Sequence, residues 1–316
     1  MHYLEFERPI AELEGKIVEL KRLAEEDPNM DIDAEVERLS SRAGTMVADT
    51  YARLGAWQKV QVARHPERPH FLDYARRILE DFTPLAGDRS FGEDQAVVAG
   101  LARFRGRPVA FIGQEKGNDT QSRIRHNFGS AMPEGYRKAV RIFEMADQFG
   151  LPVLSFCDTA GAYPGVSAEE RGQAEAIARS IQAGLSVRAP FIATIIGEGM
   201  SGGAIAIAAA SRVYMLEHAI YSVISPEGCA SILWRSADKA QEAANALKIT
   251  AQDLLQLKVI DGIVREPVGG AHRAPLETID AVADQIAAGL KEMEGISGDE
   301  LLRQRRAKFL SMGRGL

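Results

Sequence analysis

Two glycine-rich turns hold the residues that are best suited to chemistry. Asp158–Gly165 reads DTAGAYPG and Gly197–Gly203 reads GEGMSGG, and each lies between an apolar run and a helical pattern. A turn that enters a helix presents backbone N–H groups without partners, and glycine lets a ligand approach the main chain closely. Such N–H groups can hold a phosphate, or stabilise an oxyanion that forms during a reaction.

The second turn also permits a different chemistry. Gly199-Met-Ser201-Gly-Gly203 matches G-x-S-x-G, the nucleophile elbow of serine hydrolases, in the expected place between a strand and a helix. The remaining members of such a triad would follow in the order Asp253 or Asp261, then His272. A third interpretation is purely structural, in which the glycines only make room for close packing of helix on strand.

Elements that alternate between strand and helix position both turns. Val153–Cys157 and Phe191–Ile196 are continuous apolar runs, typical of buried strands. Helical patterns surround them, at 135–149, 167–182 and 202–210. Both units therefore read proline, strand, glycine-rich turn, helix. This repetition predicts an α/β core whose sheet is covered on both faces.

The flanking segments predict further elements. Residues 10–62 have helical periodicity, interrupted at Asp27-Pro28-Asn29, which indicates a helical hairpin arm. The apolar runs 96–104 and 108–112 on either side of Arg105-Gly106 predict a β-hairpin. The last forty residues are helical and charged. We expect an N-terminal helical arm and lead-in over residues 1–90 and the main domain, with C-terminal helices, over 91–316.

Composition excludes several classes of function. The 316 residues carry 38 basic and 44 acidic side chains, a net charge of −6, so nucleic-acid binding is not indicated. No apolar run is long enough for a membrane span, and the first ten residues lack the apolar stretch of a secretory signal, so a cytoplasmic protein is expected. There is no Walker A motif and no C-x-x-C, and the histidines are scattered, so we expect neither ATP hydrolysis nor a metal site in this chain.

Several long motifs resemble the carboxyltransferase α subunits of bacterial acetyl-CoA carboxylases. The similarity extends in order over residues 3 to 275. Its clearest segments are Gly113–Thr120, Arg123–Gly129, Pro133–Ala139, Asp158–Gly165, Ala168–Gln173, Gly197–Ala204 and Tyr221–Ala230.

The resemblance implies a crotonase fold, a spiral of repeated ββα units. It implies transfer of the carboxyl group from carboxybiotin to acetyl-CoA, which forms malonyl-CoA for fatty acid synthesis. The expected partner is a zinc-ribbon β subunit in an α2β2 heterotetramer. Biotin would be attached to a separate biotin carboxyl carrier protein, and a separate biotin carboxylase would use ATP.

The resemblance also implies roles for individual residues. Gly202 and Gly203 would form the oxyanion hole for the ureido oxygen of biotin, while the β subunit would supply the hole for the thioester. From their place in the two turns, five further residues would shape the cleft or contact substrate, with packing or turn scaffolding as the alternative: Gly161, Tyr163, Gly165, Gly199 and Ser201.

Three further alternatives stay open at this stage. Glu198 could be the base of a hydratase of the same fold, or the chain could be a paralogue with an inactive site. A basic strip could meet coenzyme A or the carrier protein, although a solvated face is the preferred interpretation. It consists of Arg103, Arg105, Arg107, Lys116, Arg123 and Arg125.

Overall fold

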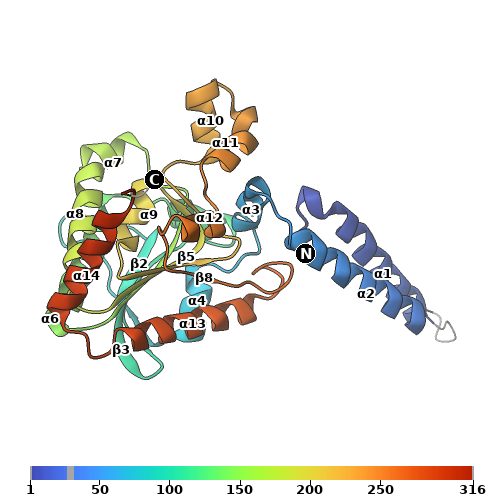
Figure 1. The fold of residues 1–316 in the computed structure, drawn as a ribbon, viewed down its shortest axis with the longest axis horizontal. Coiled ribbons are helices and arrows are strands. Elements are labelled where there is room, and N and C mark those ends of the chain that lie inside the picture. The colour runs from blue at the N-terminus through green and yellow to red at the C-terminus, as the bar shows by residue number, and fades with distance from the viewer. Residues whose placement is uncertain (1, 27–31, 315–316) are drawn as a thin grey trace.

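The computed structural model describes residues 2–26 and 32–314, in which a two-helix arm projects from an α/β body (Figure 1). After a short 3₁₀ turn, η1 (Glu5–Glu7), the arm consists of α1 (Arg8–Glu26) and α2 (Asp33–Tyr51). Their apolar stripes face each other through Leu13, Leu39 and Ala43. The predicted hairpin is therefore present, and the predicted break at Asp27-Pro28-Asn29 lies outside the described residues.

The helical pattern over 10–62 contains one more break than predicted. α2 ends at Tyr51, and a separate helix, α3 (Ala56–Ala63), begins after Gly55. α4 (Phe71–Ile78) follows, and its Phe71 and Tyr74 belong to the main core. The domain boundary near residue 90 stays a prediction.

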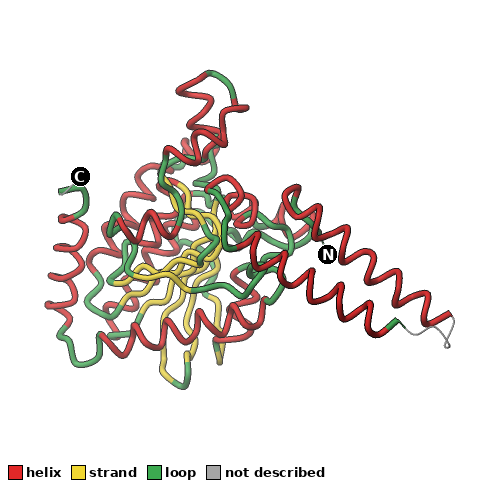
Figure 2. The backbone as a smooth tube through the Cα atoms, turned by 45° about the vertical axis from the view of Figure 1, so that its right-hand side comes forward, coloured by secondary structure: helices red, strands yellow, loops and turns green. Residues whose placement is uncertain are grey.

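Among the described residues, eight strands form one mixed sheet at the centre of the body (Figure 2). Its order is β1-β2-β3-β4-β5-β6-β8, with β7 paired to β5. β1–β2 and β2–β3 are antiparallel, and the other pairs are parallel. The strands are β1 (Glu80–Pro84), β2 (Val97–Phe104), β3 (Arg107–Gln114), β4 (Val153–Thr159), β5 (Phe191–Met200), β6 (Arg212–Leu216), β7 (Ile220–Ser222) and β8 (Gly262–Val264).

Two sequence predictions about the sheet are confirmed. β2 and β3 form the expected hairpin around Arg105-Gly106, in register from Phe104 opposite Arg107 to Val97 opposite Gln114. β4 and β5 are buried along their whole length, as their continuous apolar runs predict. Because β3, β4 and β5 are parallel neighbours, the segments that follow them meet at one edge of the sheet.

Helices cover both faces of the sheet. α6 (Pro133–Phe149), α8 (Gln173–Ser186) and α9 (Ser201–Ala208) pack against one another and β2–β5, whereas α4 and α13 (Pro275–Glu292) pack against the other face. The single helix predicted over 167–182 is wrong. α7 (Val166–Glu170) ends before Gly172, whose φ of +79° is left-handed, and α8 starts after it.

The C-terminal third adds a lobe and two long helices. α10 (Pro226–Trp234), a 3₁₀ turn η3 (Ala237–Lys239) and α11 (Ala240–Ala246) form a small lobe that projects from the body near α3 (Figure 1). α12 (Ala251–Gln256) precedes β8, and α14 (Gly298–Ser311) packs on α8. In residues 2–26 and 32–314, no helix is both long and apolar enough to cross a membrane.

Candidate functional site

The structure brings the two glycine-rich turns into direct contact. A Cβ atom on Gly203 would lie 2.8 Å from the amide nitrogen of Ala162 and 2.9 Å from the carbonyl carbon of Gly161. Gln114, at the end of β3, bridges the two turns. Its side-chain Nε2 donates to the Gly203 carbonyl (2.8 Å), and its Oε1 accepts from the Asp158 N–H (3.2 Å). The first turn therefore sets the position of the second.

The second turn presents an uncapped helix start. β5 passes into α9 at Ser201, which adopts a left-handed φ of +56°, and no side chain caps the helix. The first N–H groups of a helix have no intrahelical partner, so those at the start of α9 are available to a ligand. Gly202 is half-buried at the surface and Gly203 is buried behind it. This is the geometry in which backbone donors can stabilise negative charge.

Hydrogen bonds within the first turn and to neighbouring residues hold it in place. The Thr159 hydroxyl accepts from the Gly161 N–H (3.1 Å), and Gly161 has a φ of +132° that favours glycine. Tyr163 donates its N–H to the Ala131 carbonyl, and its own carbonyl accepts from Gln173. Its ring covers Gly165, where a Cβ would lie 2.2 Å from a ring carbon. Gly165 is thus needed to seat the Tyr163 ring.

Gly199 is explained by packing. A Cβ there would lie 2.8 Å from the ring of Tyr221, which β7 places beside β5. Of the predicted site residues, Gly161 and Gly203 therefore lie at the contact between the turns, and a Cβ on Gly202 would face Ile177 of α8 at 3.3 Å. Gly165 and Gly199 each accommodate an aromatic ring.

A charge cluster around two buried carboxylates lies just before the second turn, and no sequence motif marks it as a unit. The Lys116 ammonium lies 2.8 Å from Asp158 and 2.7 Å from Glu198, and Arg64 pairs with Glu198 at 2.6 Å and with Glu227 of α10 at 2.5 Å. The sequence held a signal for the carboxylates, because Asp158 directly follows a predicted strand and Glu198 follows the next. The cations come from residues after β3 and at the end of α3.

Charge pairing dominates the protonation of this cluster. Burial alone would raise the pKa values of Asp158 and Glu198, but the nearby Lys116 outweighs it and lowers both below their usual range. Burial would likewise lower the pKa of Lys116, and the two carboxylates instead raise it. All three groups are therefore charged at neutral pH.

A cavity of about 250 Å³ adjoins the cluster. Lys116, Glu198 and Ala160 line it, together with His70, whose Nδ1 lies 3.4 Å from Asp158.

The predicted basic strip does not exist as one surface. Lys116 is half-buried just beyond the carboxyl end of β3, while Arg103 and Arg105 lie at the β2–β3 hairpin and pair with Asp81 and Asp284.

The structure does not assemble the serine hydrolase triad. Asp253 bonds Thr250, Asp261 bonds Lys308 and the Val213 N–H, and His272 stacks on His65 with ring centroids 3.8 Å apart. In the described part of the chain, neither aspartate is hydrogen-bonded to His272. The left-handed φ of Ser201 is therefore explained by the turn from β5 into α9 and not by a role as a nucleophile.

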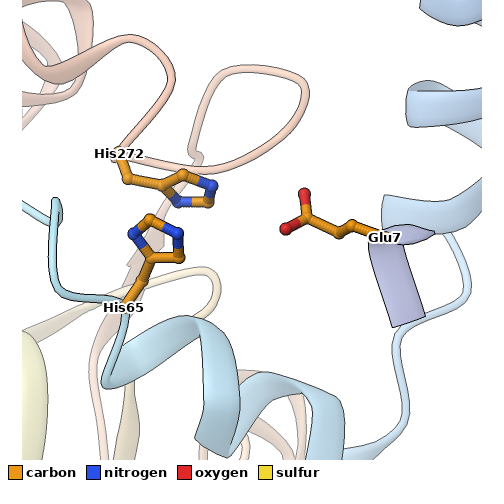
Figure 3. Close-up of side chains that lie close together, drawn as sticks. All are labelled: Glu7, His65 and His272. Carbon is orange, nitrogen blue, oxygen red and sulfur yellow. The ribbon is translucent and has the colours of Figure 1, made fainter. Parts of the chain in front are cut away.

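His272 belongs to a second cluster, at the base of the arm. Figure 3 shows the carboxylate of Glu7 pointing toward the stacked rings of His65 and His272. Each residue offers one atom that could bind a metal ion, a carboxylate oxygen or a ring nitrogen, and these atoms all lie within 4.8 Å of one another. His65 accepts from the Glu67 N–H (3.1 Å) and lies 3.0 Å from the His2 carbonyl, while Glu7 accepts from the Tyr51 hydroxyl (2.9 Å). These bonds make the cluster an anchor for the arm.

The fold matches those of solved enzymes that act on carboxyl groups. A transcarboxylase 12S with methylmalonyl-coenzyme A and methylmalonic acid bound aligns with a TM-score of 0.58 at 20% identity, over 71% of this chain and 41% of that one. A Pseudomonas malonate decarboxylase hetero-tetramer in complex with coenzyme A aligns with a TM-score of 0.56 at 18% identity, over 67% and 85%. These likenesses place the chain in the crotonase class of α/β folds, which confirms the predicted fold.

Sequence relatives define the family more narrowly. The model of the acetyl co-enzyme A carboxylase carboxyltransferase-like family matches residues 3–313, and the chain belongs to that family. The acetyl-coenzyme A carboxylase carboxyl transferase subunit alpha of Rhizobium etli (strain CIAT 652) is 65% identical over the full length of both chains, and that of Agrobacterium fabrum is 63% identical. The chain is accordingly a carboxyltransferase subunit, as the sequence motifs predicted.

Proposed function

We propose that this chain is the α subunit that transfers a carboxyl group from biotin to acetyl-CoA, forming malonyl-CoA, and that Gly202 and Gly203 supply the oxyanion hole. The observation that carries the proposal is the uncapped start of α9, fixed against the first turn by the contact of Gly203 with Gly161 and Ala162. Fixed backbone donors suit this role because no change of pH can remove their protons.

The two glycines have separate tasks. Gly202 is half-buried and carries no side chain, which leaves the main chain at the start of α9 accessible to the reacting oxygen. Gly203 allows α9 to pack directly on the first turn, which holds these N–H groups in place before the reaction. The loss of one oxyanion donor typically costs about 10²–10³ in rate.

The N–H groups at the start of α9, beside the half-buried Gly202, have no capping side chain. They can donate to the ureido oxygen of biotin, on which negative charge develops during the transfer. When bound, biotin on its carrier protein supplies the carboxyl group that is transferred. Tyr163 and Ser201 lie on the two turns, where they can orient the bound ring. The proposed oxyanion hole does not require either residue to act as a base.

An exposed apolar surface supports docking of a partner beside the site. The lobe and the strand before it expose Val223, Ile232, Leu233 and Trp234. An apolar cavity of about 350 Å³ is lined by Val223 and by Ile205 of α9, the helix of the oxyanion turn. Large exposed apolar patches mark interaction sites. We assign this surface to the β subunit of an α2β2 complex.

The remaining components follow from the same proposal. The β subunit carries the zinc ribbon and the oxyanion hole for the thioester. A biotin carboxyl carrier protein brings biotin to the site, after a biotin carboxylase has used ATP to load it. The complex acts in the bacterial cytoplasm.

A reconstitution assay tests the proposed function. Carboxyl transfer from malonyl-CoA to a biotin derivative is measured with the chain alone and with a zinc-ribbon β subunit from a relative. Activity only in the mixture supports the proposal. A mixture that forms the complex but transfers no carboxyl group refutes it and favours an inactive paralogue or a hydrolase, which an ester-hydrolysis screen separates.

A further inference from the structure

Glu198 occupies an unusual position for an ionised side chain. It is 4% exposed, lies in β5 three residues before the helix that begins at Ser201, and is paired with two cations from different parts of the chain. Lys116 contacts one carboxylate oxygen at 2.7 Å and Arg64 contacts the other at 2.6 Å. Both oxygens are therefore engaged by cations, although Glu198 also lines the cavity of about 250 Å³.

The main chain at Glu198 is held as firmly as its side chain. Its N–H donates to Asp158 at 2.9 Å, and the same oxygen of Asp158 lies 2.8 Å from Lys116. Gly197 must be glycine for this arrangement, because a Cβ there would lie 2.5 Å from the Asp158 carboxylate. The end of β5 is thereby tied to the ends of β3 and β4.

We propose that Glu198 is a positioning residue, which with Lys116 and Arg64 fixes the carboxyl end of β5 so that the N–H groups at Gly202 and Gly203 point at the reacting oxygen. The proposal rests on the proposed function and deepens it, since it concerns the same turn. It also separates this site from that of a hydratase, in which a glutamate at this place would act as the base.

The chemistry of the pairing supports this role over that of a base. A general base needs a lone pair directed at substrate and a pKa near the working pH. Both carboxylate oxygens of Glu198 are engaged by cations, and its pKa is lowered despite burial, which makes it a poor proton acceptor. A buried carboxylate between two cations instead resists displacement, because moving it would leave unpaired charge in the interior.

Two substitutions at Glu198 distinguish the roles. Glu198→Gln keeps the shape and can pair with one cation, whereas Glu198→Ala pairs with neither. A positioning role predicts graded losses in kcat, about tenfold for Gln and about 100-fold for Ala, with KM within about twofold, because oxyanion stabilisation acts in the transition state. A catalytic base predicts that both variants lose activity equally, since both lack the carboxylate.

A milder change keeps the test valid if Glu198→Ala does not fold. Arg64→Met removes one of the two cations that pair with Glu198, and the Arg64 side chain is 32% exposed. This variant should lower kcat several-fold without adding an acid limb to the pH–rate profile. The matched control is Asp280→Asn, which removes the partner of Arg77 in a surface ion pair, and its kcat and KM should equal those of the wild type. Assembly with the β subunit is checked for each variant by size-exclusion chromatography.

The outcomes separate this inference from the proposed function. If the wild-type complex transfers carboxyl groups and Glu198→Gln and Glu198→Ala are equally inactive, the positioning role is wrong while the proposed function stands. Near-wild-type kcat in Glu198→Ala or Arg64→Met would also overturn the inference. If the assembled wild-type complex is inactive, the proposed function fails first. Graded losses in kcat at constant KM support both.

Discussion

Replacing Gly203 by alanine tests the contact between the two turns most directly. The new Cβ would lie 2.8 Å from the Ala162 nitrogen and 2.9 Å from the Gly161 carbonyl carbon, whereas ordinary van der Waals contacts begin at 3.4 Å. Both neighbours are backbone atoms, so α9 must move away from the first turn by about half an ångström. The backbone N–H remains, but its position changes.

The expected cost can be estimated in two parts. Oxyanion donors work at about 2.7–3.1 Å, so a shift of this size removes one donor, about 10²–10³ in kcat or 2.7–4 kcal/mol. Overpacking should cost about 1–3 kcal/mol in the free energy of unfolding. Gly203→Val, with two more methyl groups at the same place, should abolish transfer.

The assay measures kcat and KM for carboxyl transfer from malonyl-CoA to a biotin derivative, in complexes shown to be assembled. Gly44→Ala is the matched control, because no atom lies within 4 Å of its added Cβ. A large fall in kcat at nearly constant KM is expected for Gly203→Ala alone. Near-full kcat in an assembled Gly203→Ala complex would refute the reasoning, since it would mean that the position of this turn does not limit the rate.

Three other predictions concern the turn and the buried charges. Ser201→Ala should keep most transfer activity, because no triad forms around Ser201; loss of nearly all activity would instead indicate a nucleophile. Arg305→Ala should lower the free energy of unfolding by about 3–5 kcal/mol in urea titrations, because Arg305 is buried and donates to three carbonyl groups and to Ser211; an unchanged urea midpoint would contradict this. Burial would raise the pKa of Glu266, but Arg68 lowers it to about 2. A lowered pKa stabilises the fold above the unfolded value of 4.5, and this stability is lost as pH falls from about 5 toward 2; Glu266→Gln should remove this part of the acid dependence in melting experiments.

The sequence predicted the local elements of the site well because each had a local signal. An apolar run followed by glycines marked β4, β5 and the turns after them, and Arg105-Gly106 marked the hairpin. The break at Gly172 also had a signal, the glycine itself, but the helical periodicity on either side concealed it.

The pairing of charges could not be predicted in the same way. Lys116 and Glu198 are 82 residues apart, and Arg64 and Glu198 are 134 apart. The order of strands in the sheet brings the first pair together, and the packing of α3 against β5 brings the second. Lys116 was grouped with the arginines of the hairpin because they are close in sequence. It lies instead at the opposite end of β3, among carboxylates. Sequence proximity is a poor guide to which charges are buried.

The arm has a consequence for how the protein unfolds. α1 and α2 bury Leu13, Leu39 and Ala43 in a small cluster of their own, separate from the main core, and the arm extends away from the body (Figure 1). Native proteins open in cooperative units whose stability follows the apolar contacts they contain. Beyond its anchor at Glu7, the arm is therefore expected to exchange its amide hydrogens through its own local opening, well before the sheet does. A single melting temperature would then describe the body and not the whole chain.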